Sequence, residues 1–205
     1  MMIKLYGSPM SRAARCLWAL EELELQYEHV PVIPSAETRT PEFLKINPNG
    51  HVPALEDSGK VYWESLAINL YLAEKYGQGK LWPASVEDHG YCYQWSFWAI
   101  TEVEPHLIAL AKNRVVLPPE QRSEEAATAA EEALKAPSRV IDDYLAGREY
   151  MGKTFTIGDL NVASVYSLAL FARVDLSRYL NLNAWLQRCL NRPAQQRVAG
   201  MKQQH

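Results

Sequence analysis

The chain begins with alternating apolar and polar residues and then changes to a helical period. Residues 3–6 alternate in the manner of a β-strand that is buried on one face. Ala13, Leu17 and Leu20 recur at the spacing of one helix face, and residues 27–32 return to a strand pattern. The polar side of this helix is marked by Arg12, Arg15 and Glu22. The order predicts a βαβ unit.

A turn and a short apolar run come next. Residues 47–50, Asn-Pro-Asn-Gly, have the composition of a turn, and residues 52–55, Val-Pro-Ala-Leu, that of a strand. Because Pro53 has no N–H to donate, the run indicates an edge strand or a special peptide bond. A cis bond between Val52 and Pro53 would leave the backbone of Val52 outward-facing and open to a ligand, and we predict it.

A hairpin and a helix complete this part of the chain. Residues 57–59, Asp-Ser-Gly, close the hairpin and residues 60–63 form its returning strand. The next helix opens at Glu64-Ser65 and ends at Gly77. Earlier, a loop over residues 34–39 precedes a helix start at Thr40-Pro41. The order βαβ followed by ββα is that of the thioredoxin-like α/β fold.

Strand signals disappear after residue 85, and the remaining pattern is helical. Pro118-Pro119 ends the first long helix, and an interruption of the second is expected at Pro137. Thr156 and Asp159 have the spacing of a capping box. The predicted helices cover residues 87–116, 120–145, 160–171, 182–190 and 193–198. We therefore expect an α/β domain over residues 1–77, a linker over 78–86 and an all-helical domain over 87–205.

Composition narrows the possible partners and the compartment. With 48% hydrophobic and 22% charged residues, the 205-residue chain has an ordinary globular composition. A net charge of −3 provides no basic field for nucleic acid or an acidic membrane, so neither partner is expected. Cys16, Cys92 and Cys189 are odd in number and lack metal-ligand spacing. The expectation is a cytoplasmic protein without a metal.

Val52-Pro53 followed by Glu64-Ser65 at a helix start resembles the glutathione-binding half of the cytosolic glutathione transferases. The rest of the chain is similar to the same superfamily from end to end, in particular to its serine-type, phi- and theta-like classes. The resemblance implies a thioredoxin-like domain joined to an all-α domain, glutathione as co-substrate, and a homodimer. The expected reaction conjugates the glutathione thiolate to a small hydrophobic electrophile.

Glutathione, γ-Glu-Cys-Gly, carries charged groups at both ends and a thiol in the middle. Ser65, at a helix start, is expected to donate to the γ-glutamyl carboxylate, and Glu64 to lie near the ammonium. Alternatively, Glu64 only complements the helix dipole. Val52, presented by Pro53, would pair through its main chain with the cysteinyl unit, as a strand is added to a sheet edge.

The thiol also needs a hydrogen-bond donor. In serine-type members of the family the catalytic hydroxyl follows the first strand at the start of the first helix, and Ser11 occupies the similar place here. Its hydroxyl would favour the thiolate over the thiol and would also cap the helix. Ser8 is the alternative donor. Tyr6 and Cys16 are expected to be structural.

Two further sets rest mainly on the resemblance. Arg39 and His51 are expected at the glycine carboxylate of glutathione, their alternative being solvated surface groups. Met10, Leu107 and Ile108 are expected to line the electrophile site, although the last two suit ordinary core packing equally well.

Two other functions stay open at this point. The first is glutathione-dependent reduction of disulfides or peroxides, an activity that serine-bearing members of some classes resemble. A non-catalytic interaction module would keep the shape and lose the thiol site. The presence of Ser11, Val52, Pro53, Glu64 and Ser65 argues against a module, which has no need of all of them.

Overall fold

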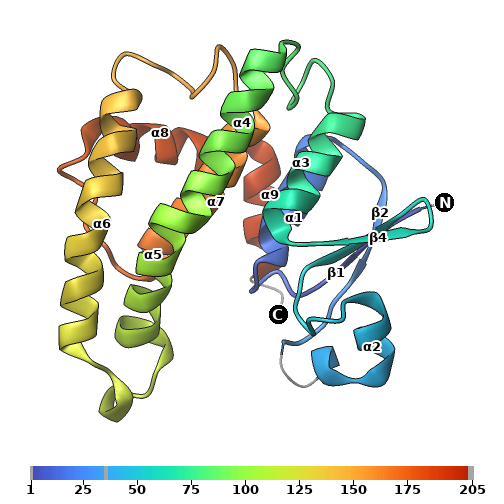
Figure 1. Ribbon diagram of the computed structural model, residues 1–205, viewed down its shortest axis with the longest axis horizontal. Coiled ribbons are helices and arrows are strands. Elements are labelled where there is room, and N and C mark those ends of the chain that lie inside the picture. Colours follow the sequence, from blue (N-terminus) through green and yellow to red (C-terminus); the bar gives the residue numbers. More distant parts are fainter. Residues whose placement is uncertain (1, 35–36, 203–205) are drawn as a thin grey trace. The chain divides into compact units, whose positions relative to one another are not determined.

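The computed structural model describes residues 2–34 and 37–202 of the chain (Figure 1). By their contacts the residues form two units, one that runs to Ala84 and resumes at Arg192, and one that covers Ser85–Asn191. The strands of the described residues all belong to the first unit, and the second is helical. The predicted combination of an α/β domain and an all-α domain is confirmed.

The first unit is built on a sheet with the strand order β2-β1-β3-β4. The central strand β1 (Ile3–Tyr6) pairs parallel with β2 (Tyr27–Val30) and antiparallel with β3 (Ala54–Asp57), which pairs with β4 (Lys60–Trp63). Helices α1 (Ala13–Glu22) and α3 (Ser65–Tyr76) pack against each other, and α2 (Pro41–Ile46) lies between β2 and β3 in sequence (Figure 1). This is the predicted thioredoxin-like order.

Three boundaries in this unit differ from the predictions. The strand β2 ends at Val30 rather than at residue 32, because Pro31 has no N–H for the ladder. For the same reason β3 begins at Ala54, after Pro53, and not at Val52. The expected loop over residues 34–39 contains a short 3-10 turn, Glu37–Arg39, while residues 35–36 lie outside the described residues.

The segment expected to be a free linker is packed onto the first unit. The Trp82 N–H donates to the carbonyl of Gly77 at 2.8 Å, and the Gly79 N–H donates to the carbonyl of Trp82 at 3.3 Å. Leu81 and Trp82 are buried. Burial of the Trp82 indole fixes the segment to the first unit, whereas Gly79 and Pro83 by themselves indicate a flexible connection.

The last helix, α9 (Pro193–Lys202), also belongs to the first unit, although the sequence placed it in the helical domain. Arg192 forms a bidentate ion pair with Glu22, with distances of 2.6 and 2.8 Å, and Arg197 pairs with Glu21 at 2.5 Å. Both carboxylates lie at the end of α1, which packs against α9. Contacts made by residues about 170 positions apart decide this grouping.

The second unit begins with the predicted long helix. It runs from α4 (Val86–Trp98) through α5 (Glu104–Ala111), with a wider π-type stretch after each, Ala99–Val103 and Lys112–Val116. The first stretch ends next to Pro105, whose missing N–H relaxes the regular hydrogen-bond ladder. The helices α6 (Glu124–Tyr144), α7 (Ile157–Phe171) and α8 (Leu180–Leu190) follow.

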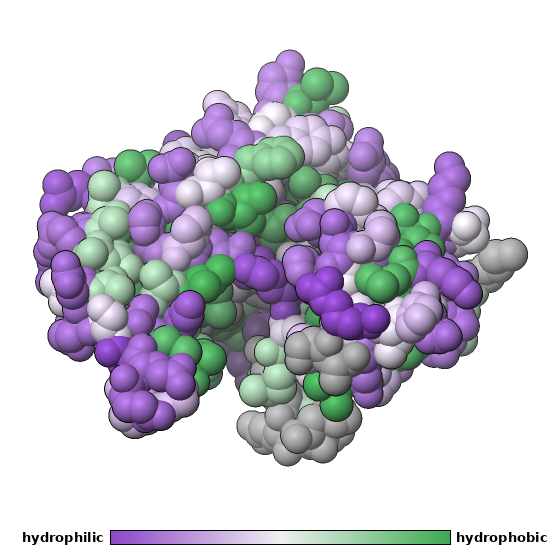
Figure 2. All heavy atoms as spheres, turned by 60° about the horizontal axis from the view of Figure 1, so that its bottom comes forward, coloured by the Kyte–Doolittle hydropathy of each residue, from purple (hydrophilic) through white to green (hydrophobic). Residues whose placement is uncertain are grey.

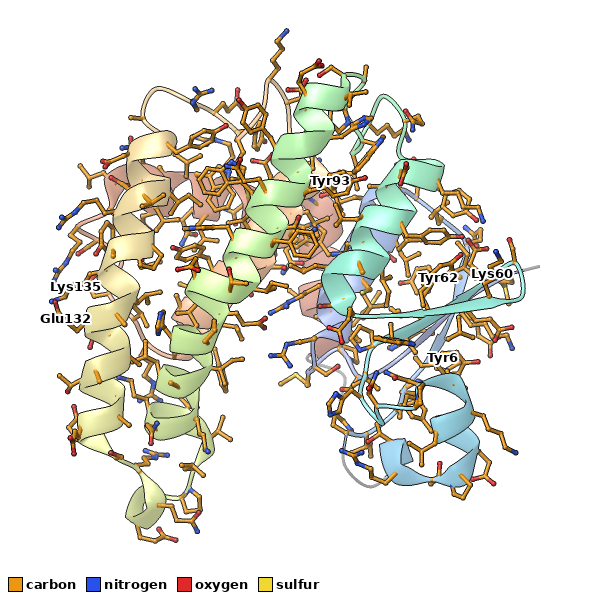
Figure 3. The ribbon with its side chains drawn as sticks, in the orientation of Figure 1. Tyr6, Lys60, Tyr62, Tyr93, Glu132 and Lys135 are labelled. Carbon is orange, nitrogen blue, oxygen red and sulfur yellow. The ribbon has the colours of Figure 1, made fainter. Side chains whose placement is uncertain are left out.

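The expected interruption at Pro137 is wrong, because α6 continues through it. Ala130, Leu134, Ser138 and Ile141 form a buried stripe on both sides of the proline. Packing of that stripe outweighs the local loss of one backbone hydrogen bond. The long helix also keeps a polar outer side, where Glu132 and Lys135 form an ion pair (Figure 3).

The capping box at Thr156 is confirmed. Thr156 and Asp159 satisfy each other's backbone N–H groups at the start of α7.

On the face shown in Figure 2 the surface is mostly hydrophilic, and hydrophobic side chains occur in small groups between polar ones. No helix among the described residues has both the length and the apolar character needed to cross a membrane.

Candidate active site

Gly7 is the residue around which the site is assembled. A Cβ atom at Gly7 would lie 2.7 Å from Cβ of Ala13, 3.1 Å from Cβ of Val52 and 3.6 Å from Oγ of Ser11. Its φ of +138° is a conformation that other residues rarely adopt. Glycine therefore lets the end of β1, the start of α1 and the backbone before β3 approach one another. Ser11 and Val52 therefore both lie next to Gly7.

The carbonyl of Gly7 is held by a histidine that the sequence analysis did not single out. His29 of β2 places Nε2 2.7 Å from this oxygen. Because a carbonyl only accepts, Nε2 carries the proton and donates it. Together with the bond from the Gly7 N–H to the Val30 carbonyl at 3.0 Å, this contact ties the loop after β1 to β2.

Ser11 lies one residue before the position predicted for it. Helix α1 begins at Ala13 with Arg12 as its N-cap, so Ser11 precedes the cap. Its Oγ accepts from the Ala13 N–H at 3.1 Å and donates to the Ser8 carbonyl at 2.7 Å. The hydroxyl thus closes the turn before α1, and its proton can reach a thiolate only by rotating away from the Ser8 carbonyl.

Two other hydroxyls near this loop, those of Ser8 and Tyr6, also form hydrogen bonds. Ser8 Oγ accepts from the Met10 N–H at 3.1 Å. Tyr6 donates its phenol proton to Glu56 at 3.2 Å (Figure 3). Burial, followed by this hydrogen bond, raises the pKa of Tyr6. A raised pKa makes the phenol a poorer donor to a thiolate, so Ser11 and Ser8 stay the two candidate donors.

A buried polar seam joins α1 to the start of α3. Arg15 Nη1 donates to Ser65 Oγ at 3.4 Å, and the thiol of Cys16 donates to the Ser65 carbonyl at 3.5 Å. Asn69 Nδ2 donates to the Arg15 carbonyl at 3.2 Å. All of these residues are buried. Burial raises the pKa of the Cys16 thiol, which agrees with a structural role.

The seam corrects the interpretation of Arg15 as part of a polar helix side. Its exposed fraction is 5%. A signal existed in the sequence, since Trp18 and Ala19, one turn further along the same side of the helix, are apolar. A charged residue above such neighbours is a candidate for a buried functional group.

Glu64, which precedes α3, has an unusual backbone conformation. Its φ is 72° and its ψ is 111°, outside the left-handed helical region that some residues tolerate. It is the N-cap of α3 without a capping hydrogen bond from its exposed side chain. Strained conformations of this kind cost of order 1–3 kcal/mol and concentrate at functional sites.

Val52 has the predicted backbone. The Val52–Pro53 bond is cis, which confirms that prediction. Among the described residues, neither the N–H nor the carbonyl of Val52 forms a backbone hydrogen bond. Val52 is half-buried. Its main chain can therefore accept an added strand-like segment.

Arg39 and His51 flank the turn before Val52, and both are exposed. Arg39 Nη1 donates to the Asn49 carbonyl at 3.2 Å and lies 2.7 Å from where a Cβ of Gly50 would be. The His51 carbonyl accepts from Asn47 Nδ2 at 2.7 Å. The basic side chain thus lies on the same turn that leads to Val52.

The residues expected at the electrophile site are divided between the two units. Met10, in the first unit, is 67% exposed. In the second unit Leu107 is fully buried, which assigns it to the core, and Ile108 is 39% exposed. No group of three or more His, Cys, Asp or Glu side chains within residues 2–34 and 37–202 could hold a metal ion.

The arrangement defines a class of protein, one with a thioredoxin-like unit that carries an open backbone at Val52, a helix start at Ser65 and a hydroxyl at Ser11. Residues 1–74 match the glutathione S-transferase N-terminal domain, and residues 103–193 match the C-terminal domain. The chain belongs to the glutathione S-transferase family.

Named relatives are similar in sequence to this chain over nearly all of its length. Glutathione S-transferase GstB of Escherichia coli is 34% identical over 96% of this chain and 97% of its own length. Glutathione S-transferase 1 of Zea mays is 34% identical over 97% of this chain and 96% of its own.

Solved structures of glutathione transferases have the same fold as this chain. A glutathione S-transferase-I with bound lactoylglutathione superposes with a TM-score of 0.87 at 31% identity, covering 98% of this chain and all of that one. A theta class enzyme from Xanthomonas axonopodis pv. citri with bound glutathione gives 0.89 at 29% identity, with 96% of each chain covered.

Proposed function

We propose that this glutathione transferase binds glutathione along Val52 and the start of α3, activates its thiol at Ser11, and transfers the sulfur to a small hydrophobic electrophile. The observation that carries this proposal is the close approach at Gly7, which lies against both Val52 and Ser11. A cysteinyl residue paired with the open main chain of Val52 has its side chain within reach of the Ser11 hydroxyl.

The two ends of glutathione find matching groups. The α-carboxylate of the γ-glutamyl residue accepts from Ser65 and from the first N–H groups of α3, where the helix dipole also favours an anion. The exposed Glu64 receives the ammonium. Arg39, whose guanidinium contacts the turn that leads to His51, receives the glycine carboxylate, with His51 as a second candidate.

Catalysis consists of holding the thiolate and presenting it to the electrophile. The Ser11 hydroxyl rotates from the Ser8 carbonyl to the sulfur, and the thiol proton leaves to solvent. A pKa lowered from about 8.5 to about 6.5 raises the thiolate fraction at neutral pH roughly twentyfold. The sulfur lone pair then forms a C–S bond, while the electron pair of the broken bond leaves with the displaced group or stays on the opened electrophile. Met10, which is exposed beside Ser11 in the sequence, is our candidate for a contact with the electrophile.

We also propose a homodimer in the cytoplasm. Tyr91, Tyr93 and Phe97 are exposed on α4 (Tyr93 is labelled in Figure 3), and aromatic residues of this kind are enriched in protein interfaces. The three cysteines are thiols and form no disulfide, which suits a reducing compartment. Light scattering would test the dimer, and Phe97→Glu should convert it to a monomer.

The function is tested with purified protein, glutathione and a panel of substrates. Halogenated aromatics, epoxides and isothiocyanates report conjugation, whereas hydroperoxides and mixed disulfides report reduction. Conjugation that exceeds reduction supports the proposal. Reduction alone would replace it with a reductase, and glutathione binding by calorimetry without any turnover would leave an interaction module.

A further inference from the structure

The contact between Arg15 and Ser65 has a consequence for how glutathione is recognised. Serine Oγ has one proton and two lone pairs, while a guanidinium only donates. At the 3.4 Å contact Ser65 must therefore be the acceptor, and its single proton points elsewhere. Within the described parts of the chain, no contact of Ser65 Oγ uses that proton.

The unused proton lies at the start of a helix, where an anion can bind. Ser65 is 6% exposed and is the first residue of α3, a helix of 12 residues. The cap residue Glu64 makes no side-chain hydrogen bond to the first turn, so the turn keeps N–H groups available. A buried hydroxyl proton and available N–H groups together suit a carboxylate.

We propose that Arg15 is a positioning residue of the γ-glutamyl subsite. By donating to Ser65 Oγ, it orients the Ser65 hydroxyl as a donor to a carboxylate at the start of α3. Ser65, oriented by Arg15, and the exposed Glu64 that precedes it would together select an α-amino-acid head, with its carboxylate at Ser65 and its ammonium at Glu64. This inference rests on the proposed glutathione binding.

The experiment compares two peptides that differ only in the carboxylate. One is glutathione, and the other is γ-aminobutyryl-cysteinyl-glycine, which keeps the ammonium, the thiol and the glycine end. Dissociation constants are measured by calorimetry for the wild type and for Arg15→Met. We expect the variant to bind glutathione about tenfold more weakly, the scale of one hydrogen bond to a charged group, and the analogue less than about twofold more weakly.

A matched control removes a neighbouring arginine. Arg12 is exposed at the start of α1. In salt of about 0.15 M its charge is screened, so Arg12→Met should change both constants by less than about twofold. If Arg12→Met lowers the preference for glutathione over the analogue as much as Arg15→Met does, the effect comes from overall charge. That result would overturn the proposed role of Arg15.

A double variant tests whether Arg15 acts through Ser65. In a Ser65→Ala background, Arg15→Met should weaken glutathione binding by a factor at least about threefold smaller than in the wild type. Independent effects would remove the orienting role of Arg15.

Arg15→Lys keeps the test usable if Arg15→Met does not fold. It retains the charge but loses the fixed planar donor, and should reduce the preference for glutathione over the analogue about threefold. Equal weakening for both peptides, in any folded Arg15 variant, would show a purely structural role. Failure of the wild type to bind glutathione would instead reject the proposed function.

Discussion

The starts of α7 and α3 are both buried and polar, yet they are built in opposite ways. At α7, Asp159 accepts from the N–H of Met151 at 2.8 Å, the N–H and hydroxyl of Thr156 at 3.0 and 3.1 Å, and the Trp185 indole at 2.9 Å. At α3, Glu64 caps nothing and Ser65 keeps its proton. A helix start that satisfies itself stabilises the fold, whereas one left open can bind a ligand.

The electrostatics of Asp159 show what the closed arrangement requires. Burial raises the pKa of Asp159, while the hydrogen bonds donated to it act in the opposite direction. Four donors around one carboxylate compensate for its removal from water. The open start of α3 has no such internal compensation, and a bound carboxylate would provide it.

The largest expected effect is the loss of the closed start. Asp159→Ala would leave buried donors on Met151, Thr156 and Trp185 without their acceptor. We expect the free energy of unfolding to fall by about 4 kcal/mol. Denaturant titration measures this, with Asp159→Asn as the milder control because it keeps one acceptor oxygen. A loss below about 1 kcal/mol would mean that the network is dispensable.

Ser11→Ala is expected to affect turnover more than stability. Removing a hydrogen bond to a charged sulfur costs about 1.5–3 kcal/mol, so kcat/KM should fall about ten- to a hundredfold. Thiolate absorbance of the binary complex should show an upward pKa shift of about one to two units for the bound thiol. If neither quantity changes, Ser11 only closes the turn before α1, and Ser8 becomes the candidate donor.

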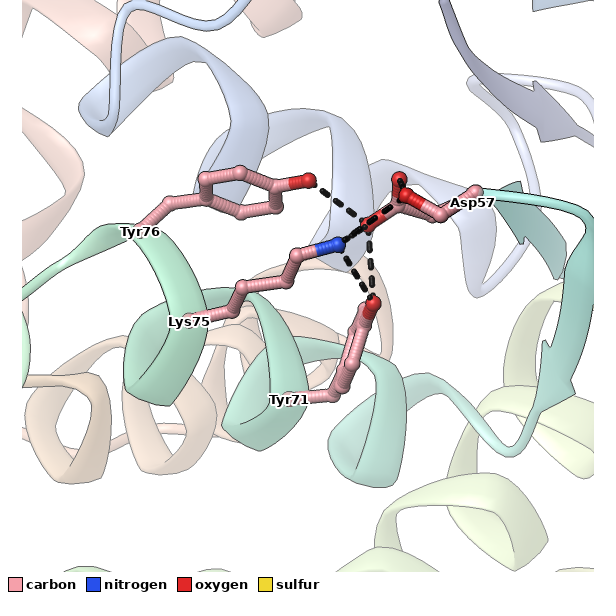
Figure 4. Close-up of polar contacts among 5 residues, drawn as sticks. Asp57, Tyr71, Lys75 and Tyr76 are labelled. Atoms are coloured by element: carbon pink, nitrogen blue, oxygen red, sulfur yellow. Dashed lines mark hydrogen bonds and ion pairs between the residues drawn. The ribbon is translucent and has the colours of Figure 1, made fainter. Parts of the chain in front are cut away.

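A second closed cluster lies within the first unit and makes a pH-dependent contribution to stability. Asp57 accepts from Lys75 and Tyr76 at 2.7 Å and from Tyr71 at 2.8 Å (Figure 4). Burial alone would raise the pKa of Asp57, but these hydrogen bonds and one from Ser58 outweigh it and lower the pKa to about 2. The cluster fixes the β3–β4 turn to α3.

Because the pKa of Asp57 is lower in the folded state, its stabilisation is present above the unfolded value and is lost as pH falls. Asp57→Asn should therefore cost about 2 kcal/mol at neutral pH, and the difference from the wild type should shrink between about pH 4 and about pH 2. Urea titrations across this range measure it. A difference that is independent of pH would assign the stabilisation to packing of the tyrosines instead.

The smallest effect is expected at the open start. Ser65→Ala should raise the dissociation constant of glutathione about tenfold, because one hydrogen bond to a carboxylate is lost. The free energy of unfolding should fall by about 1 kcal/mol, because the variant removes the acceptor of the buried Arg15 guanidinium. The opposite result, an unchanged constant with a large loss of stability, would make α3 resemble α7 and remove Ser65 from the site.

Local chemistry explains why much of the site was visible in the sequence. Pro53 after Val52, Glu64-Ser65 at a helix start and Thr156 with Asp159 each act within a few residues, so their geometry follows from composition. The cis bond and the capping box are confirmed for this reason. Gly7 and His29 were missed because their importance depends on atoms from three strands and a helix.

By itself, the sequence determined the order of strands and helices, the hairpin, the cis bond before β3 and the family. Only the tertiary structure decided that α9 belongs with α1, that Trp82 holds the expected linker, that α6 continues through Pro137 and that Arg15 is buried against Ser65. The first group follows from interactions between near neighbours. The second depends on side chains that meet only after the chain has folded, where packing and buried ion pairs outweigh local preference.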